Sequence, residues 1–339
     1  MKRNIFAVCD LEVEYAVNFM EYLNRRKNLP FEIQAFTSVE SLGNFAAAQH
    51  IELLLISARA MCREVREMDI GKVIILSEGT LPQEMDPYPS VYKYQPSSQI
   101  LREVMSCYGK GEESRPLLFP VMKRNTQILG VYSPLKRCLK TSFALTLGQI
   151  LAREKAVLYL NLEEYSGFEE LTGTSPQNGM SDLLYYVRQR EKNLVLRVNS
   201  LVCSVNNLDY IPPVHTPWDI REAPWEDWEW LLSELERNSG YEVLILDIGT
   251  EMDEIFRLLD RCSRIYMPVL SDKVSLAKLS QYENLVRVWD FPQILEKTVR
   301  ITPPFHLENG GSGGYDYISR LPWTELGDYV RKLLHNHNR

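Results

Sequence analysis

The stretch GVYSPLKRCLKTSFALTLGQIL, residues 130–151, decides the fold of the second half of the chain. The residues from Ile128 to Tyr132 form an apolar run that predicts a short buried strand. Apolar side chains then recur at helical spacing, at Phe143, Leu147, Ile150 and Leu151. A strand, a loop and a helix in this order place the loop at the carboxyl end of a strand, where open α/β sheets bind ligands.

The loop carries part of a phosphate-binding pattern. In G-x-x-x-x-G-K-[ST], the lysine reaches nucleotide phosphates and the hydroxyl group ligates Mg²⁺. Lys140 and Thr141 stand at these two positions, whereas Pro134 and Leu139 replace the glycines that allow unusual dihedral angles and close approach to phosphate. The predicted nucleotide-contacting residues of the loop are Lys136, Arg137, Cys138, Leu139, Lys140, Thr141 and Ser142.

Length and composition are those of an ordinary globular protein. The chain has 339 residues, of which 45% are hydrophobic and 24% charged, and this length allows two separate cores. A net charge of −7 argues against a general affinity for nucleic acid or anionic lipid. Six scattered cysteines without a C-x-x-C pair, and an N-terminus without a signal-peptide pattern, favour the reducing cytoplasm. Because no apolar run approaches the roughly 18–20 residues that cross a bilayer, we expect membrane contact to be peripheral at most.

The pattern of strands and helices predicts two α/β domains. Strand-like and helix-like runs alternate up to Cys107, and the alternation restarts after the polar stretch GKGEESRP, residues 109–116. We therefore predict two doubly wound parallel-sheet domains, at 1–108 and 120–339, joined by a linker at 109–119.

The first half resembles the receiver domain of two-component response regulators. That family holds Mg²⁺ with acidic residues after the first strand, phosphorylates an Asp at the end of the third, and pairs it with a Lys before a Pro. Asp10 and Glu12 match the first feature, but Ser57 ends the third strand and Gln95 precedes the proline. Without the carboxylate nucleophile and the cation, we predict a receiver-like (flavodoxin-like) interaction domain with no aspartyl phosphorylation.

Two further segments extend the nucleotide pattern of the second half. AVLYLNLEEYSGF, residues 156–168, and YEVLILDIGT, residues 241–250, read as strands that end in polar residues. With the loop, they resemble in order and spacing the MinD/ParA branch of P-loop ATPases. The resemblance implies ATP and Mg²⁺ as ligands and a P-loop NTPase fold for the domain. It also implies roles for three residues: Glu163 and Asp247 are catalytic, and Gly249 offers its N–H to the γ-phosphate.

The same resemblance assigns the Mg²⁺ contacts, through the nucleotide, to Thr141 and Asp247. Three departures weaken the chemistry. The family's signature lysine is replaced by Leu135, Leu139 replaces a loop glycine, and Asn161 stands where a carboxylate would help to organise Mg²⁺. An apolar strand that ends in Asp also occurs in α/β proteins simply because Asp caps turns. We therefore expect slow or absent hydrolysis.

The order of the two domains is the more specific feature. A receiver-like domain followed by a MinD/ParA-like domain with an irregular loop resembles the TadZ/CpaE group, which are localisation factors of the Flp pilus machinery. The resemblance implies a homodimer with a protein partner in a localisation, secretion or pilus machinery. We predict a cytoplasmic scaffold with weak or no ATP hydrolysis. Two alternatives stay open: an active ATP-dependent dimerising switch, and a DNA-partitioning protein, against which the acidic charge counts.

Two amphipathic helices of the second half are predicted to pack in its core. The first carries Trp225, Trp228, Leu232 and Leu235 at helical spacing. The C-terminal helix carries Trp323, Leu326, Val330, Leu333 and Leu334, and we expect it to dock on the sheet rather than on a membrane.

Overall fold

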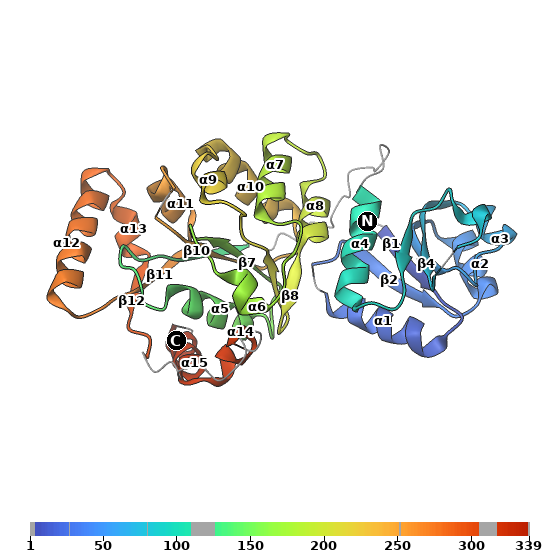
Figure 1. Cartoon of the computed structure of the whole chain (residues 1–339), viewed down its shortest axis with the longest axis horizontal. Coiled ribbons are helices and arrows are strands. Elements are labelled where there is room, and N and C mark those ends of the chain that lie inside the picture. The colour runs from blue at the N-terminus through green and yellow to red at the C-terminus, as the bar shows by residue number, and fades with distance from the viewer. Residues whose placement is uncertain are drawn as a thin grey trace. The chain divides into compact units, whose positions relative to one another are not determined.

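The computed structural model describes residues 4–26, 28–79, 81–109, 126–250, 252–304 and 317–337. The chain forms two compact units, each with one β-sheet (Figure 1). Apart from Gly109, the predicted linker lies outside the described residues. No helix among the described residues is long and apolar enough to cross a membrane.

The first unit is built on a five-stranded parallel sheet. Its strands run in the order β2 (Phe31–Phe36), β1 (Asn4–Cys9), β3 (Ile51–Ser57), β4 (Ile70–Ser77) and β5 (Ser90–Tyr92). This is the order of flavodoxin-like folds. The central strands are nearly continuous apolar runs because helices cover both faces of the sheet. The helices are α1 (Val13–Arg25), α2 (Val39–Ala48), α3 (Arg63–Arg66) and α4 (Ser97–Gly109), with a 3₁₀ turn at Gln83–Met85.

The second unit is built on a seven-stranded sheet. Its order is β12 (Thr298–Ile301), β11 (Arg264–Pro268), β6 (Gln127–Val131), β10 (Val243–Ile248), β7 (Val157–Leu162), β9 (Leu208–Ile211) and β8 (Cys203–Val205). The edge strand β8 is antiparallel to β9, while the other pairs are parallel. Asn206 and Asn207 join β8 to β9 with φ angles of 46° and 67°, the positive values that a tight hairpin turn requires. The sequence reading missed this hairpin.

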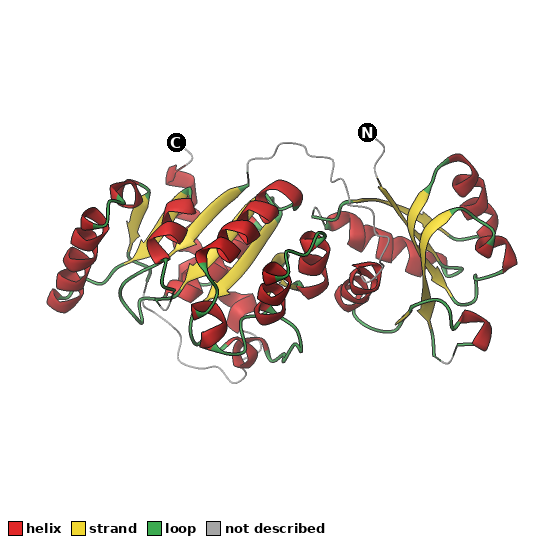
Figure 2. Ribbon diagram, turned by 90° about the horizontal axis from the view of Figure 1, so that it is seen from above, coloured by secondary structure: helices red, strands yellow, loops and turns green. Residues whose placement is uncertain are grey.

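The helices of the second half complete an α/β architecture (Figure 2). They are α5 (Lys140–Leu151), α6 (Phe168–Thr172), α7 (Met180–Arg188), α8 (Leu194–Leu201), α9 (Pro217–Arg221), α10 (Trp225–Asn238), α11 (Ile255–Arg261), α12 (Lys273–Val288), α13 (Pro292–Glu296), α14 (Tyr317–Arg320) and α15 (Glu325–His337). A 3₁₀ turn, Leu321–Trp323, lies between α14 and α15. The strand, loop and helix predicted around residues 130–151 are present as β6, the loop after it and α5.

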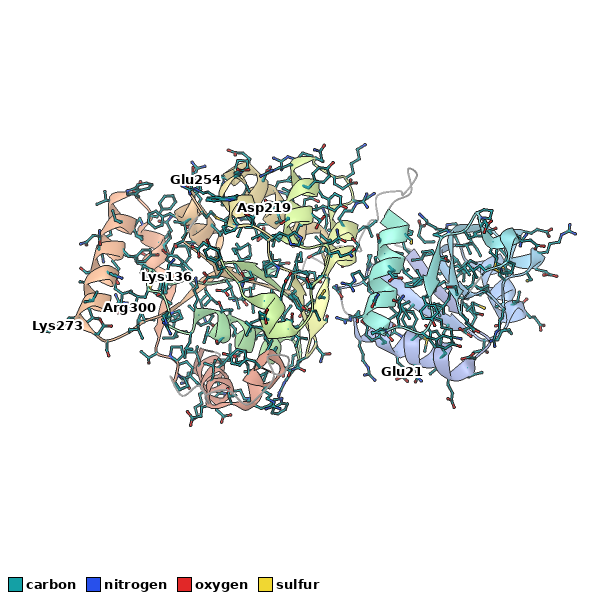
Figure 3. All side chains as sticks on the ribbon, in the orientation of Figure 1. Glu21, Lys136, Asp219, Glu254, Lys273 and Arg300 are labelled. Atoms are coloured by element: carbon teal, nitrogen blue, oxygen red, sulfur yellow. The ribbon has the colours of Figure 1, made fainter. Side chains whose placement is uncertain are left out.

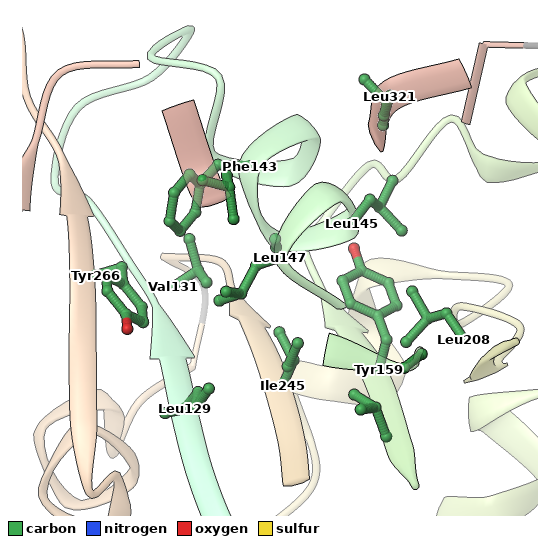
Figure 4. Close-up of a cluster of buried hydrophobic side chains, with 14 of the residues drawn as sticks. Leu129, Val131, Phe143, Leu145, Leu147, Tyr159, Leu208, Ile245, Tyr266 and Leu321 are labelled. Carbon is green, nitrogen blue, oxygen red and sulfur yellow. The ribbon is translucent and has the colours of Figure 1, made fainter. Parts of the chain in front are cut away.

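The core of the second unit forms around α5. Phe143, Leu145 and Leu147 are fully buried in a cluster with side chains of β6, β7, β10 and β11 (Figure 4). Helix α15 packs against α5 and contributes buried Leu326 and Val330 to the same cluster. Because neighbours cover α5 on more than one side, it is buried over most of its surface rather than along one face.

Both amphipathic helices pack largely as predicted. Trp228, Leu232 and Leu235 of α10 are buried. The C-terminal helix docks on α5 instead of directly on the sheet. Trp323 was expected in the core but is 73% exposed, with the Arg153 guanidinium 4.8 Å from its ring centroid. This arrangement leaves Trp323 as a surface aromatic held by a cation–π contact.

Candidate functional site

A cavity of about 480 Å³ lies at the carboxyl ends of β6 and β7. The predicted loop residues, Lys136 to Ser142, all line it, as does Glu163. Figure 3 shows Lys136 among the side chains of the second unit. Five further residues, which were not predicted to contact nucleotide, also line it: Ser133, Leu135, Glu164, Tyr165 and Thr250. The cavity therefore has the location at which open α/β sheets bind ligands.

The loop adopts a glycine-like backbone without glycine. Arg137 and Leu139 have φ angles of 60° and 61°, in the left-handed region. Side chains that occupy this region cost about 1–2 kcal/mol per residue. Among the described residues, no acceptor is found for the backbone N–H groups of Lys136, Arg137 and Leu139. Successive free N–H groups in such a turn form an anion-binding concavity, so the backbone retains the feature that the glycines were expected to supply.

Buried anchors hold this loop in place. Leu135 and Cys138 are only 4% and 3% exposed. The Ser133 hydroxyl donates to the carbonyl of Pro268 at 2.7 Å and accepts from the N–H of Leu135 at 3.2 Å. Burial of two side chains and these bonds offset the unfavourable dihedral angles. Leu135, at the position where the resemblance to MinD/ParA proteins leads one to expect a lysine, thus has a structural role here.

Lys140 is engaged within the protein. Its ammonium group forms an ion pair with Glu163 and donates to the carbonyl of Ile248. The two paired side chains are 10% and 20% exposed. Burial raises the pKa of Glu163 to about 7; the charge of Lys140 acts against this rise, and that of Asp247 adds to it. A phosphate group must therefore compete with Glu163 for Lys140.

Asp247 is fully buried at the end of β10. Its Oδ2 accepts from the Tyr159 hydroxyl at 2.9 Å and faces Asn161 Nδ2 at 3.4 Å. Its Oδ1 has no hydrogen-bond partner among the described residues. Burial raises the pKa of Asp247, against the charge of Lys140 and the hydroxyls of Thr141 and Tyr159. A buried oxygen without a partner beside Thr141 fits an Mg²⁺ ion carried by a nucleotide.

Asn161 is bonded to the Tyr159 hydroxyl, which contacts Asp247, and to the backbone of Glu163. Its Nδ2 donates to Tyr159 at 2.9 Å, and its Oδ1 accepts from the N–H of Glu163 at 3.1 Å. Asn161 is itself fully buried. Sequence reasoning missed Tyr159, although strand alternation places residues 159 and 161 on one face of β7. The residue that replaces a metal-organising carboxylate is therefore a positioning residue.

Glu164 joins the loops that follow β7 and β10. Its Oε1 accepts from the N–H and the hydroxyl of Thr250, at 2.8 and 2.7 Å. Burial acts to raise the pKa of Glu164, but the two bonds from Thr250 outweigh it and hold the pKa at about 2. The carboxylate is therefore ionised at neutral pH, and Glu164 lines the cavity.

Gly249 has a packing role at this junction. Its N–H donates to the carbonyl of Leu162 at 3.0 Å, and a Cβ at this position would lie 2.5 Å from the same oxygen. The close approach of two strand ends requires a glycine here. Gly249 does not line the cavity, and its predicted contact with a γ-phosphate would require the N–H to leave Leu162.

The first unit corrects one prediction. The cation taken to be missing, because Gln95 precedes the proline, is present at Lys93, directly after β5. Its buried ammonium group lies 2.8 Å from Asp10, 3.2 Å from Glu12 and 3.4 Å from Glu78. Burial acts to lower the pKa of Lys93, but Asp10 and Glu12 outweigh it and raise the pKa.

Ser57 ends β3, where the resemblance places the phosphorylated Asp. It is 1% exposed, and its hydroxyl group finds no hydrogen-bond partner among the described residues. In the first unit, the Asp10, Glu12 and Glu78 carboxylates are thus paired with the Lys93 ammonium group. Ser57 supplies no carboxylate nucleophile beside them.

No protein-family model and no curated protein matches the sequence. Among solved structures, the chain is similar to a ParA family ATPase from Chlorobium tepidum TLS, with 16% identity and a TM-score of 0.46 over 58% of this chain and 81% of that one. It is also similar to cobyrinic acid a,c-diamide synthase from Mycobacterium smegmatis with bound ATP analog and magnesium, with 12% identity and a TM-score of 0.44 over 63% and 96%. A plasmid partition protein from Borrelia burgdorferi gives 16% identity and a TM-score of 0.42 over 61% and 99%.

Proposed function

We propose that the second unit binds ATP with Mg²⁺ and hydrolyses it slowly or not at all. The observation that carries this proposal is the loop after β6. Its left-handed residues, Arg137 and Leu139, leave backbone N–H groups without an acceptor among the described residues, beside Lys140 in the lining of the cavity. Free N–H groups and a lysine at the start of α5 are the elements that hold a phosphate chain.

The residues around the loop would have separate roles in binding the nucleotide and its Mg²⁺. Thr141 and Asp247 would hold Mg²⁺, which neutralises phosphate charge when it is bound. Lys140 would exchange Glu163 for a phosphate oxygen. Glu163 is the carboxylate best placed to orient water, but it is paired with Lys140 in this structure. Binding without efficient hydrolysis follows from this arrangement.

At the level of the cell, we propose a cytoplasmic localisation or scaffold protein. The resemblance to the TadZ/CpaE group, pilus-positioning factors with a receiver-like first domain, supports this role. The first unit would recruit a protein partner, since Ser57 at the end of β3 supplies no carboxylate nucleophile for aspartyl phosphorylation. The net charge of −7 argues against DNA partitioning.

One observation favours the alternative, an active ATP-dependent switch. Burial raises the pKa of Glu163 to about 7, a value at which a carboxylate can accept a proton from attacking water. If phosphate draws Lys140 away, Glu163 becomes available for this role. Phosphate release under saturating Mg²⁺-ATP separates the two functions, because the scaffold gives no turnover above background and the switch gives turnover that Glu163→Gln removes.

Isothermal titration with Mg²⁺-ATP tests the binding proposal. We expect micromolar binding by the wild type and at least tenfold weaker binding by Lys140→Ala, since a charge-assisted bond to phosphate is worth about 1.5–3 kcal/mol. Lys155→Ala is the matched control, because this exposed lysine follows the far end of α5. No heat from the wild type at millimolar nucleotide, or equal losses in both variants, would contradict the proposal.

A further inference from the structure

Helix α12 carries an apolar stripe that faces away from its own unit. Its buried face consists of Ser275, Leu279, Tyr282 and Val286. On the other side, five exposed positions follow one another at helical spacing: Val274, Ala277, Gln281, Leu285 and Val288. Val274 is 64% exposed and Val288 is 77% exposed. Figure 1 shows α12 at the margin of the second unit, and Figure 3 shows Lys273 pointing outward from its first turn.

The helix that presents this stripe is well fixed. The Asp272 carboxylate caps its start by accepting from the N–H groups of Val274 and Ser275, each at 3.0 Å. On the inner side, the Tyr132 and Tyr282 rings pack with centroids 5.5 Å apart. The exposed stripe is therefore the outer surface of an anchored helix rather than of a frayed one.

The stripe is symmetric about its centre. Val274 and Val288 lie seven residues before and after Gln281, while Ala277 and Leu285 lie four residues before and after it. Suppose that two copies of α12 pack antiparallel about a two-fold axis at Gln281. Val274 of each copy then meets Val288 of the other, and the small Ala277 of each copy faces the larger Leu285 of the other. The two Gln281 amides meet each other, and an amide can donate to and accept from its own copy.

Charge favours the antiparallel arrangement over a parallel one. A parallel pair in register would set Lys273 and Lys278 against their own copies, and like charges repel. The antiparallel pair sets Lys278 opposite Asn284 and Lys273 opposite the exposed ring of Trp289, where a cation–π contact is favourable. Antiparallel helix dipoles also attract each other.

We propose that α12 is a homodimerisation surface, which joins two copies of this chain antiparallel about Gln281 without nucleotide. This interface would be independent of the loop after β6. A helix of 16 residues spans about 24 Å, so one helix pair buries less than the roughly 800 Å² per partner of a typical stable complex. The dimer should therefore dissociate on dilution, in the micromolar range.

Analytical ultracentrifugation of the nucleotide-free full chain tests the proposal from about 1 to 100 μM. We expect a reversible monomer–dimer equilibrium that Leu285→Glu weakens at least tenfold. Leu276→Glu is the matched control, because Leu276 is also exposed on α12 but lies outside the stripe. The double variant Ala277→Lys with Leu285→Glu should restore dimers, since it places opposite charges face to face. A wild type that stays monomeric, or a dimer that Leu285→Glu leaves unchanged, overturns the proposal.

Cysteine cross-linking tests the register. Only position 281 meets its own copy, so Gln281→Cys should give a covalent dimer on mild oxidation. Val274→Cys alone should not, whereas a mixture of Val274→Cys and Val288→Cys proteins should. The wild type supplies the background of the native cysteines. Cross-linking by Val274→Cys alone, or none by Gln281→Cys, overturns the antiparallel arrangement.

Discussion

Replacing Glu163 by Gln should tighten nucleotide binding. In the nucleotide-free protein, the Glu163 carboxylate pairs with Lys140 and competes with phosphate for it. Glutamine keeps the size of the side chain but removes the charge, while the Ile248 carbonyl still positions the lysine. A hydrogen bond to a charged group is worth about 1.5–3 kcal/mol, which corresponds to roughly ten- to hundredfold tighter binding of Mg²⁺-ATP.

The increase in affinity for Mg²⁺-ATP caused by Glu163→Gln should depend on pH. Burial raises the pKa of Glu163 to about 7. As the pH falls through this value, the wild-type carboxylate becomes neutral and releases Lys140, so wild-type affinity should approach that of Glu163→Gln. Above this value the carboxylate is ionised and the difference should be largest. Protonation of ATP itself affects both proteins equally and cancels from the ratio.

Isothermal titration at pH 6 and pH 8 measures both effects. Glu170→Gln is the control, because it removes one exposed carboxylate after the same strand without touching Lys140. Weaker or unchanged nucleotide binding by Glu163→Gln at pH 8 would refute the idea that Glu163 competes with phosphate for Lys140. An equal increase in affinity in Glu170→Gln would refute it as well.

Three further predictions concern stability, and urea unfolding measures each of them. Arg137→Gly should stabilise the second unit by about 1 kcal/mol, because glycine adopts a positive φ without strain, and Arg137→Ala should not. Gly249→Ala should destabilise it by about 1–3 kcal/mol, since the added Cβ would lie 2.5 Å from the Leu162 carbonyl oxygen; an unchanged midpoint would count against the close approach. Lys93→Met should cost the first unit about 3–5 kcal/mol, because it leaves Asp10 buried without its cation.

The fold was largely predictable from hydrophobic patterning. β6, the loop after it and α5 follow from the apolar run at Ile128 and the helical spacing after Phe143. The hairpin at Asn206 was missed because β8 has only three residues and too little alternation to mark a strand. The exposure of Trp323 was missed because periodicity identifies a face but not the end of a helix at which packing stops.

The residues of the site were predictable from the sequence, but the contacts between them were not. Position along the motif identified Lys140, Glu163 and Asp247, whereas the pairing of Lys140 with Glu163 depends on how β6 and β7 lie beside β10. Sequence reasoning treated Leu139 as an obstacle to phosphate binding. The structure shows instead a left-handed leucine in a loop anchored by buried neighbours, a tertiary effect that no local propensity contains.

Lys93 shows the limit of motif alignment. The expected cation was sought immediately before a proline, but the chain supplies it directly after β5. Only the pairing of β5 with β4 reveals that the lysine reaches the carboxylates of the β1 loop.

We propose that the loop after β6, which has no glycine, holds nucleotide phosphate through its backbone N–H groups. Amide hydrogen exchange of residues 136–141, with and without Mg²⁺-ATP, tests it most directly. We predict fast exchange in the free protein, because the N–H groups of Lys136, Arg137 and Leu139 have no acceptor among the described residues, and marked slowing with Mg²⁺-ATP that Lys140→Ala abolishes. Exchange in this loop that saturating Mg²⁺-ATP leaves unchanged would contradict the account.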